Sequence, residues 1–416
     1  MPEDTMATPE PQSPTSPSPG LLSARAGAWD AGSEGPHVPS GTDAGPARST
    51  VAGSDAAAET AEGGYGALGG AGDPGEVDPA KLRHHGDVDA RPGMLDFAVN
   101  VQGSGPPGWL RARLAARLGE LGRYPGQEQE AAARSAVAAR HGRTPQEVLL
   151  LAGAAEGFAM LPRLAAGLAA VVHPSFTEPE LALREAGVAV TRVVLPEPYE
   201  LDPALIPEAA DLVVLGNPTN PTSVLHPART IRALRRPGRL VVVDEAFADA
   251  VPGEPESLAA QPFEDVLVLR SLTKTWALAG LRCGYFLGPP ALLARLGHGR
   301  AHWPLGTLQL EAIAATAHPD AVAESHARAR DIAADRAEMI PRLRALGIAV
   351  HEPARAPFVL IRVPDAELLR KRLAETGIAV RRGDTFPGLG PGHLRLAVRP
   401  PAEVDRLIAA LREVGL

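Results

Sequence analysis

Lys274 has the side chain in this sequence that is best suited to covalent chemistry. It lies between two threonines in residues 271–285, directly after an apolar run at residues 266–269, and a small-residue turn and an arginine follow it. Lysine carries the side-chain amine that can bond covalently to the aldehyde of a cofactor. A lone lysine in a loop is otherwise a solvated surface charge. Because the pattern covers all of residues 271–285 and has partners upstream, it favours a reactive amine.

Two polar turns upstream follow apolar runs of the same kind. Residues 212–215 end in a turn that contains Asn217 before a proline, and residues 240–243 end in Asp244. Strands buried on both faces read as continuous apolar runs, and α/β proteins bind ligands beyond the carboxyl ends of their strands. We therefore expect both turns to reach the same rim of a sheet as Lys274. The alternatives are a turn asparagine and a helix-capping aspartate.

A small-residue turn further upstream is suited to binding an anion. Residues 148–152 lead into Gly153, Ala154 and Ala155, ahead of an Ala- and Leu-rich helical segment. Backbone N–H groups at the start of a helix attract anions, and the helix dipole adds to the attraction. Such turns are common, so this motif is weak by itself. The next strand is followed by Phe176, for which a stacking role and an ordinary core position are both open.

The elements that must position these residues alternate along the chain. Apolar strands separated by helical stretches are predicted at residues 148–152, 169–172, 189–195, 212–215, 240–243, 266–270 and 283–287. This alternation predicts an α/β fold with a mostly parallel seven-stranded sheet and helices on both faces. A smaller C-terminal α/β domain is predicted from strands at 358–363, 378–382 and 394–399.

The chain divides into four predicted regions. They are a disordered acidic Pro/Gly/Ala-rich tail (1–80), an N-terminal arm packing with the small domain (81–122), a large domain (123–300) and a small C-terminal domain (301–416). The tail has no apolar periodicity, so it cannot bury enough surface to offset its ordering entropy. It holds twelve Asp/Glu and two Lys/Arg, a net charge of −10, and the whole chain is −8, so the remainder is about +2.

Composition limits the classes of function. A body near neutrality without a basic patch gives no case for nucleic acid. No apolar run approaches the ~20 residues of a membrane span, and the tail lacks the basic start and apolar core of a signal peptide. The one cysteine, Cys283, excludes an intramolecular disulfide, and we expect a cytoplasmic protein. We expect no metal site, since the pair His84 and His85 has no other ligands nearby.

Residues 271–285 and their upstream partners resemble the lysine segment of fold-type I pyridoxal 5'-phosphate (PLP) enzymes, in the aminotransferase class I/II group. The resemblance implies the PLP-dependent transferase fold and attachment of the cofactor aldehyde to Lys274. It also implies that Ser271 and Arg282 hold the cofactor phosphate.

The same resemblance assigns the upstream turns. It implies that the turn at Ala154 and Ala155 cradles the PLP phosphate and that Phe176 stacks on the PLP ring. Asp244 would stabilise the protonated pyridine nitrogen, which makes PLP a strong electron sink. Asn217 would donate a hydrogen bond to the ring oxygen and border the substrate.

Arg395, His85 and one of two adjacent arginines are predicted to bind the substrate. Arg395 stands where fold-type I aminotransferases carry the arginine that clamps the substrate α-carboxylate, and its planar fork matches a carboxylate. The alternative is an edge-strand arginine in solvent. Arg381 and Arg382 are adjacent on a strand, so at most one of them faces the pocket. The substrate phosphate is expected near His85, Arg381 or Arg382.

Tyr124, in the sequence Arg-Tyr-Pro-Gly, matches an aromatic residue that reaches the cofactor phosphate from the partner chain in this family. The alternative is an ordinary loop tyrosine before a proline turn. The resemblance therefore implies a homodimer in which Tyr124 serves the neighbouring site.

Within the class, the sequence resembles threonine-phosphate decarboxylase and its relatives in cobalamin biosynthesis, with histidinol-phosphate aminotransferase as a near neighbour. The features favouring the former include His85-Gly86-Asp87 and Phe247, where the aminotransferase usually has tyrosine. We therefore expect decarboxylation of L-threonine O-3-phosphate to (R)-1-amino-2-propanol phosphate, with a class I/II aminotransferase as the alternative. A PLP-binding module without catalytic activity is the remote alternative. The two reactions diverge only in which bond at Cα is held perpendicular to the cofactor ring.

Overall fold

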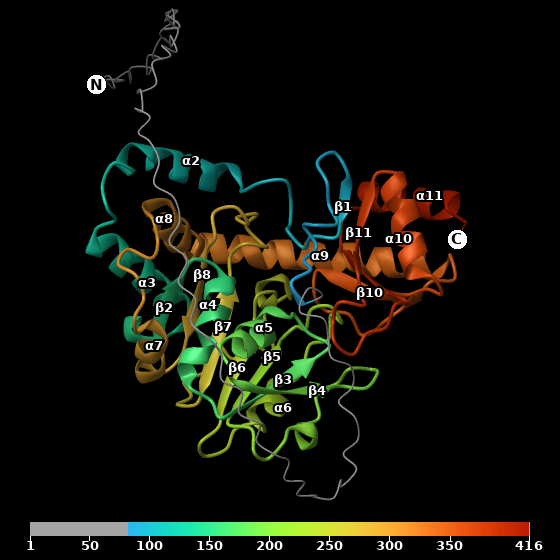
Figure 1. Ribbon diagram of the computed structural model, residues 1–416. Helices are drawn as coiled ribbons and strands as arrows, with labels where there is room; N and C mark the ends of the chain where they lie inside the picture. Colours follow the sequence, from blue (N-terminus) through green and yellow to red (C-terminus); the bar gives the residue numbers. More distant parts are fainter. Residues whose placement is uncertain (1–81, 416) are drawn as a thin grey trace, which may run out of the picture. The chain divides into compact units, whose positions relative to one another are not determined.

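The structure is a computed structural model that describes residues 82–415 (Figure 1). The predicted tail at residues 1–80 lies outside the described residues. No helix in the described range is long and apolar enough to cross a membrane.

Seven strands form the larger sheet, in the order β2-β8-β7-β6-β5-β3-β4. Their bounds are β2 Val148–Leu151, β3 Leu168–His173, β4 Ala189–Val194, β5 Leu212–Gly216, β6 Leu240–Asp244, β7 Val266–Ser271 and β8 Gly284–Leu287. Strand β8 is antiparallel to β2 and β7, and the other pairings are parallel. The predicted seven-stranded, mostly parallel sheet is therefore confirmed.

Helices cover both faces of this sheet, which explains why its central strands β5 and β6 are continuous apolar runs up to their last residue. On β6, Val241 and Val243 pack in one core cluster and Val242 in another, and all three are fully buried. The helices of the described chain are α2 Gly108–Ala116, α3 Gln127–His141, α4 Ala154–Met160, α5 Glu178–Glu185, α6 Ala228–Arg232, α7 Pro290–Gly297, α8 Thr307–Thr316, α9 Pro319–Arg344, α10 Ala366–Glu375 and α11 Pro401–Glu413. Short 3-10 helices lie at η1 Leu118–Glu120, η2 Pro145–Glu147, η3 Leu161–Leu164, η4 Pro203–Leu205 and η5 Ala248–Ala250.

A second, five-stranded sheet has the order β1-β11-β12-β10-β9. Its strands are β1 Leu95–Phe97, β9 Ala349–Val350, β10 Phe358–Arg362, β11 Ile378–Arg382 and β12 His393–Ala397. Strand β1 comes from the N-terminal segment and pairs in parallel with β11, beside which it lies in Figure 1. The long helix α9 packs against β9, β10 and α11 of this part of the chain. The exact domain boundaries at 122/123 and 300/301 stay predictions.

Candidate active site

A cavity of about 570 Å³ lies at the carboxyl ends of β6 and β7. Its wall combines four parts of the chain: the N-terminal segment, the start of α4, the strand ends of the larger sheet, and two arginines of the smaller sheet. The predicted residues that line it are His85, Ala154, Ala155, Phe176, Asp244, Ser271, Lys274, Arg282, Arg381 and Arg395. Asn217 and Tyr124 are not part of the lining.

A larger open groove of about 910 Å³ lies away from these residues, around Leu240 and Asp265. Several arginines line it, but the chain itself satisfies them. Arg235 donates to Asp265 at 2.6 Å, and Arg239 donates to backbone carbonyls. The smaller cavity, which holds the lysine and the aspartate, is therefore the candidate active site.

Lys274 follows β7 in a loop whose backbone is fixed from the N-terminal segment. The carbonyl of Lys274 accepts a hydrogen bond from the Gln102 N–H at 3.0 Å. Burial, together with the positive charges of Arg395 and Arg282, lowers the pKa of Lys274 to about 8. A substantial share of this amine is therefore neutral near physiological pH, which a nucleophile or a general base requires.

Asp244 ends β6 and faces the same cavity. Burial raises the pKa of Asp244 to about 7. The Ala246 N–H, which donates to Asp244 Oδ1 at 3.0 Å, opposes this rise, the charge of Glu245 adds to it, and Lys274 opposes it. A cation placed beside this carboxyl would favour its ionised form. The site thus suits a protonated ring nitrogen.

The small-residue turn after β2 leaves room for a ligand to come close to the backbone. Gly153 has a φ of +81°, and a Cβ at this position would lie 3.0 Å from Arg282 Nη2. Helix α4 begins at the next residue, Ala154. Ser271 is buried, and its hydroxyl lies 2.8 Å from the Thr273 hydroxyl. The turn, Ser271 and Arg282 therefore lie around one cavity, and their role in holding a phosphate stays a prediction.

The structure corrects the prediction for Asn217. The Asn217 Nδ2 donates to the His226 carbonyl at 3.1 Å, and its Oδ1 accepts from the His226 N–H at 2.8 Å. Both ends of this buried amide thus fix a neighbouring loop. The asparagine of this turn that lines the cavity is Asn220, three residues later, which sequence reasoning missed. The turn shows two Asn-Pro pairs, which were the only available signal.

Arg395 is buried, so it is not the solvated edge-strand arginine of the alternative interpretation. It donates from Nη1 to Asn220 Oδ1 at 2.7 Å and from Nη2 to the Ala98 carbonyl. Its Nε has no hydrogen-bond partner among residues 82–415. Burial lowers the pKa of Arg395 to about 9, so the side chain is still cationic at neutral pH. It therefore offers a charged donor within the cavity.

Arg381 lines the cavity, and Arg382 does not. Arg381 is buried and donates from Nη2 to the His84 carbonyl at 2.6 Å and to the Thr385 hydroxyl at 2.7 Å. Its Nη1 has no hydrogen-bond partner in the described part of the chain, and burial lowers its pKa to about 10. Arg382 forms a two-pronged ion pair with Asp384, at 2.6 and 2.7 Å. Of these two adjacent arginines, only Arg381 can offer a donor to an anion in the cavity, and the nearest carboxylate oxygen to its Nη1 is Asp89 Oδ2 at 3.9 Å.

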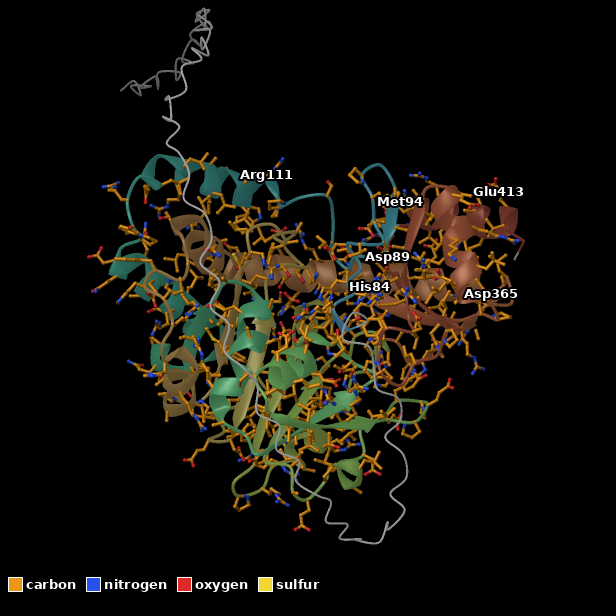
Figure 2. All side chains as sticks on the ribbon, viewed as in Figure 1. His84, Asp89, Met94, Arg111, Asp365 and Glu413 are labelled. Atoms are coloured by element: carbon orange, nitrogen blue, oxygen red, sulfur yellow. The ribbon has the colours of Figure 1, made fainter. Side chains whose placement is uncertain are left out.

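The N-terminal segment covers the cavity from one side. His85 Nε2 lies 2.6 Å from Glu178 Oε1, and the His85 ring packs on Phe176 with centroids 5.4 Å apart. His84 and Asp89 are labelled close together near the smaller sheet in Figure 2, and His84 Nε2 lies 3.1 Å from Asp89 Oδ2. His85 and Phe176 are therefore in the cavity wall, although Phe176 also contacts Phe158 of the core.

Tyr124 lies on the surface, with 74% of its area exposed. It stacks on Trp303, itself 55% exposed, with ring centroids 4.2 Å apart and an angle of 19° between the rings. It does not reach the cavity of its own chain. Its predicted role in a neighbouring site stays a prediction.

Comparison with known proteins places this geometry in context. The sequence pattern of the family described as "Aminotransferase class I and II" matches residues 93–411. A Mycobacterium tuberculosis protein named histidinol-phosphate aminotransferase is 59% identical over 334 residues, which are 80% of this chain and 91% of the relative. The threonine-phosphate decarboxylase of Salmonella typhimurium is 30% identical over 340 residues, covering 77% of this chain and 91% of the relative. The crystal structure of the histidinol-phosphate aminotransferase from Clostridium acetobutylicum has the same fold, with a TM-score of 0.72, 23% identity, and coverage of 77% of this chain and 99% of that one.

These identities contradict the prediction of a threonine-phosphate decarboxylase. A relative at 59% carries the aminotransferase name, whereas the decarboxylase reaches 30%. The residues that favoured the decarboxylase, His85, Asp87 and Phe247, do line the cavity. They do not separate the two reactions, because both reactions need the same binding of an amine and an anion before any bond at Cα breaks.

Proposed function

Because this chain belongs to the aminotransferase class I and II family, we propose that it transfers the amino group of histidinol phosphate to 2-oxoglutarate. The chain is an enzyme whose cofactor is PLP. The observation that carries the substrate assignment is the 59% identity to a protein named histidinol-phosphate aminotransferase over 80% of this chain.

The residues of the cavity fit PLP. The turn at Gly153 leaves room for an anion where a side chain would meet Arg282. Asp244 is a buried carboxyl suited to a protonated ring nitrogen, and Lys274 supplies the amine for the cofactor aldehyde. Asn100 Oδ1, Arg381 Nη1 and Arg395 Nε are buried polar atoms without hydrogen-bond partners among the described residues. All three residues line the cavity, so a polar ligand would satisfy them.

Each residue has a role that follows from its position. When bound, PLP would stabilise negative charge at the substrate Cα. Lys274 would take the Cα proton as a general base, for which its lowered pKa is suited. Asp244 would hold the proton on the ring nitrogen, and Asn220, which accepts a hydrogen bond from Arg395, would take the role at the ring oxygen that was predicted for Asn217.

The two buried arginines would bind the acidic groups of the two substrates. Histidinol phosphate brings a phosphate, and the dicarboxylic partner brings carboxylates. Arg395 and Arg381 stay cationic at neutral pH and line one cavity. Charge-assisted hydrogen bonds from guanidinium groups are well matched to both kinds of anion. We assign Arg395 to the carboxylate of the dicarboxylic partner and Arg381 to the phosphate.

We also propose a homodimer in which Tyr124 completes the neighbour's site. Tyr124, Trp303, Leu118 and Leu121 each expose more than half of their area. Exposed apolar and aromatic side chains of this size often mark a protein interface. The stacked pair of Tyr124 and Trp303 supports an ordered contact there.

The reaction is tested by giving one PLP-loaded preparation two substrates. With histidinol phosphate and 2-oxoglutarate, glutamate should form; with threonine phosphate, no CO2 should be released. Arg381→Ala should raise KM for histidinol phosphate by roughly 10- to 150-fold, because a charged hydrogen bond contributes about 1.5–3 kcal/mol. Arg382→Ala is the matched control and should leave KM nearly unchanged. Release of CO2 without glutamate would overturn the proposal, and equal effects of the two substitutions would overturn the role of Arg381.

A further inference from the structure

A cluster of buried charges lies behind the cavity, and the proposed reaction does not use it. Arg270 of β7 is 2% exposed. Its Nη1 donates to Glu245 Oε2 at 3.1 Å and to Glu254 Oε2 at 2.6 Å. Arg140 of α3 donates to Glu254 as well, at 3.3 Å. Burying charges is costly even when they are paired, and apolar side chains of similar volume often serve stability equally well. The position of this cluster therefore suggests a use.

The cluster and the cavity share the same two strand ends. Asp244 and Ser271 line the cavity. Their chain neighbours, Glu245 and Arg270, are buried in the cluster. Successive residues of an extended strand point to opposite sides, so each strand end carries one residue for the cavity and one for the cluster. The ion pair between Glu245 and Arg270 thus joins β6 to β7 directly behind the cofactor-facing residues.

Glu245 is held in one position by several donors. Its Oε1 accepts from the Leu258 N–H at 2.7 Å, and its Oε2 accepts from the Ser257 hydroxyl at 2.6 Å as well as from Arg270. Its own backbone N–H donates to the Leu269 carbonyl at 2.9 Å. Side chain and backbone of Glu245 therefore both connect to β7 or to the loop beside it. This leaves little freedom for Asp244, the preceding residue.

We propose that Arg270 and Glu245 are positioning residues for the active site: their ion pair fixes the spacing between the ends of β6 and β7, and with it the placement of Asp244 and Lys274. The pair also sets the charge behind Asp244, since Glu245 contributes a negative charge and Arg270 offsets it. The inference rests on the proposed contact of Asp244 with the cofactor ring.

The charges of Glu245 and Arg270 should shift the pKa of Asp244 in opposite directions. Asp244 must be ionised to hold a proton on the ring nitrogen, so activity falls as the pH drops through its pKa. The charge of Glu245 raises that pKa and the charge of Lys274 lowers it. The other charged or titratable groups facing the cavity are Asp87, Glu178, His84, His85, Arg282, Arg381 and Arg395, and the substitutions below leave them in place. Removing the charge of Glu245 should lower the pKa of Asp244, and removing the charge of Arg270 should raise it.

The test uses the full-length enzyme loaded with PLP and four variants: Glu245→Gln, Arg270→Met, the double variant, and Glu254→Gln. The matched control is Glu254→Gln, which removes a carboxylate from the same cluster but not the one beside Asp244. Two quantities are followed between pH 5 and 9, the acid limb of kcat/KM and the visible absorbance of bound PLP. Melting temperatures report separately on folding.

The acid limb and the absorbance transition should move to lower pH in Glu245→Gln and to higher pH in Arg270→Met, by about half a unit to one unit. The double variant should return towards the parent, and Glu254→Gln should leave the limb in place. An acid limb and an absorbance transition that stay in place in both Glu245→Gln and Arg270→Met, or an equal shift in Glu254→Gln, would overturn the proposal. If Arg270→Met does not fold, the comparison of the two Glu→Gln variants still decides. Asp244→Asn should abolish the acid limb, which tests the role of Asp244 by itself.

Discussion

The amine of Lys274 is prepared for reaction by what surrounds it. Burial lowers its pKa to about 8, and the charges of Arg395 and Arg282 act in the same direction. The sign follows directly: below this pH the amine is mostly protonated and unreactive, and above it the neutral form predominates. Labelling of PLP-free protein by an amine-directed reagent should therefore rise at Lys274 as the pH passes through about 8.

The chain contains three lysines, Lys81, Lys274 and Lys371, which makes the labelling experiment easy to read by peptide mapping. Lys371 is largely exposed and serves as the internal control. Loading with PLP should protect Lys274 but not Lys371. Borohydride treatment of the loaded enzyme should then fix the cofactor on Lys274. An adduct on either of the other lysines would contradict the assignment of the whole site.

The residues that sequence could and could not place differ in a physical way. Lys274 and Asp244 were predictable because Asp244 is the last residue of a buried apolar strand and Lys274 lies three residues after another, so the strands bring both residues to one edge of the sheet. Asn217 and Asn220 share one proline-rich turn, where no periodicity fixes side-chain direction. Their roles are decided by partners distant in sequence, His226 for the first and Arg395 for the second.

Among the elements, the seven strands of the larger sheet were predictable from their continuous apolar runs. Strand β1 was not, because its three residues are too few to show a period and its partner β11 lies far along the chain. Its pairing with β11 is nevertheless what brings the N-terminal segment to the cavity. The local sequence pattern thus does not show which distant strands pair with each other.

The buried carboxylate of Glu180 links helix α5 to the larger sheet, and a substitution can test this link. Glu180 is fully buried, lies 2.9 Å from His173 Nε2, and accepts from Arg184 at 2.6 Å and from Arg192 at 2.8 Å. Burial alone would raise its pKa, but these donors outweigh burial and hold the pKa at about 2. Glu180→Gln should lower the free energy of unfolding at pH 7 by about 3 kcal/mol.

The pH dependence of that loss has a fixed sign. A carboxyl whose pKa is depressed on folding stabilises the protein above its unfolded pKa, and the contribution disappears as the pH falls towards the folded value. The difference between the parent and Glu180→Gln in urea unfolding should therefore shrink between about pH 4.5 and 2. The control is Glu185→Gln on the same helix, where the carboxylate is half exposed and pairs with Arg83. That change should cost less than about 0.5 kcal/mol. Similar losses for both would contradict the fastening role of Glu180.

The last prediction concerns the proposed homodimer. In the proposed homodimer, each active site combines Lys274 of one chain with Tyr124 of the other. Tyr124 is 74% exposed in the single chain and does not line its own cavity. A residue that completes the active site of the other chain has to be exposed in this way. Tyr124→Ala alone should weaken PLP binding, and Lys274→Ala alone should abolish turnover.

Mixing the two inactive or impaired variants, after dissociation and reassociation, separates this arrangement from a structural role. In a mixed dimer, the chain with Tyr124→Ala keeps its lysine and receives an intact Tyr124 from the chain with Lys274→Ala. One site per mixed dimer is then complete, so about a quarter of the parent activity should return in a statistical mixture, in which about half the dimers are mixed. Trp303→Ala should act like Tyr124→Ala, because the stacked ring holds Tyr124 in place. A fully active monomer, or activity that never exceeds the sum of the separate variants, would contradict the shared site.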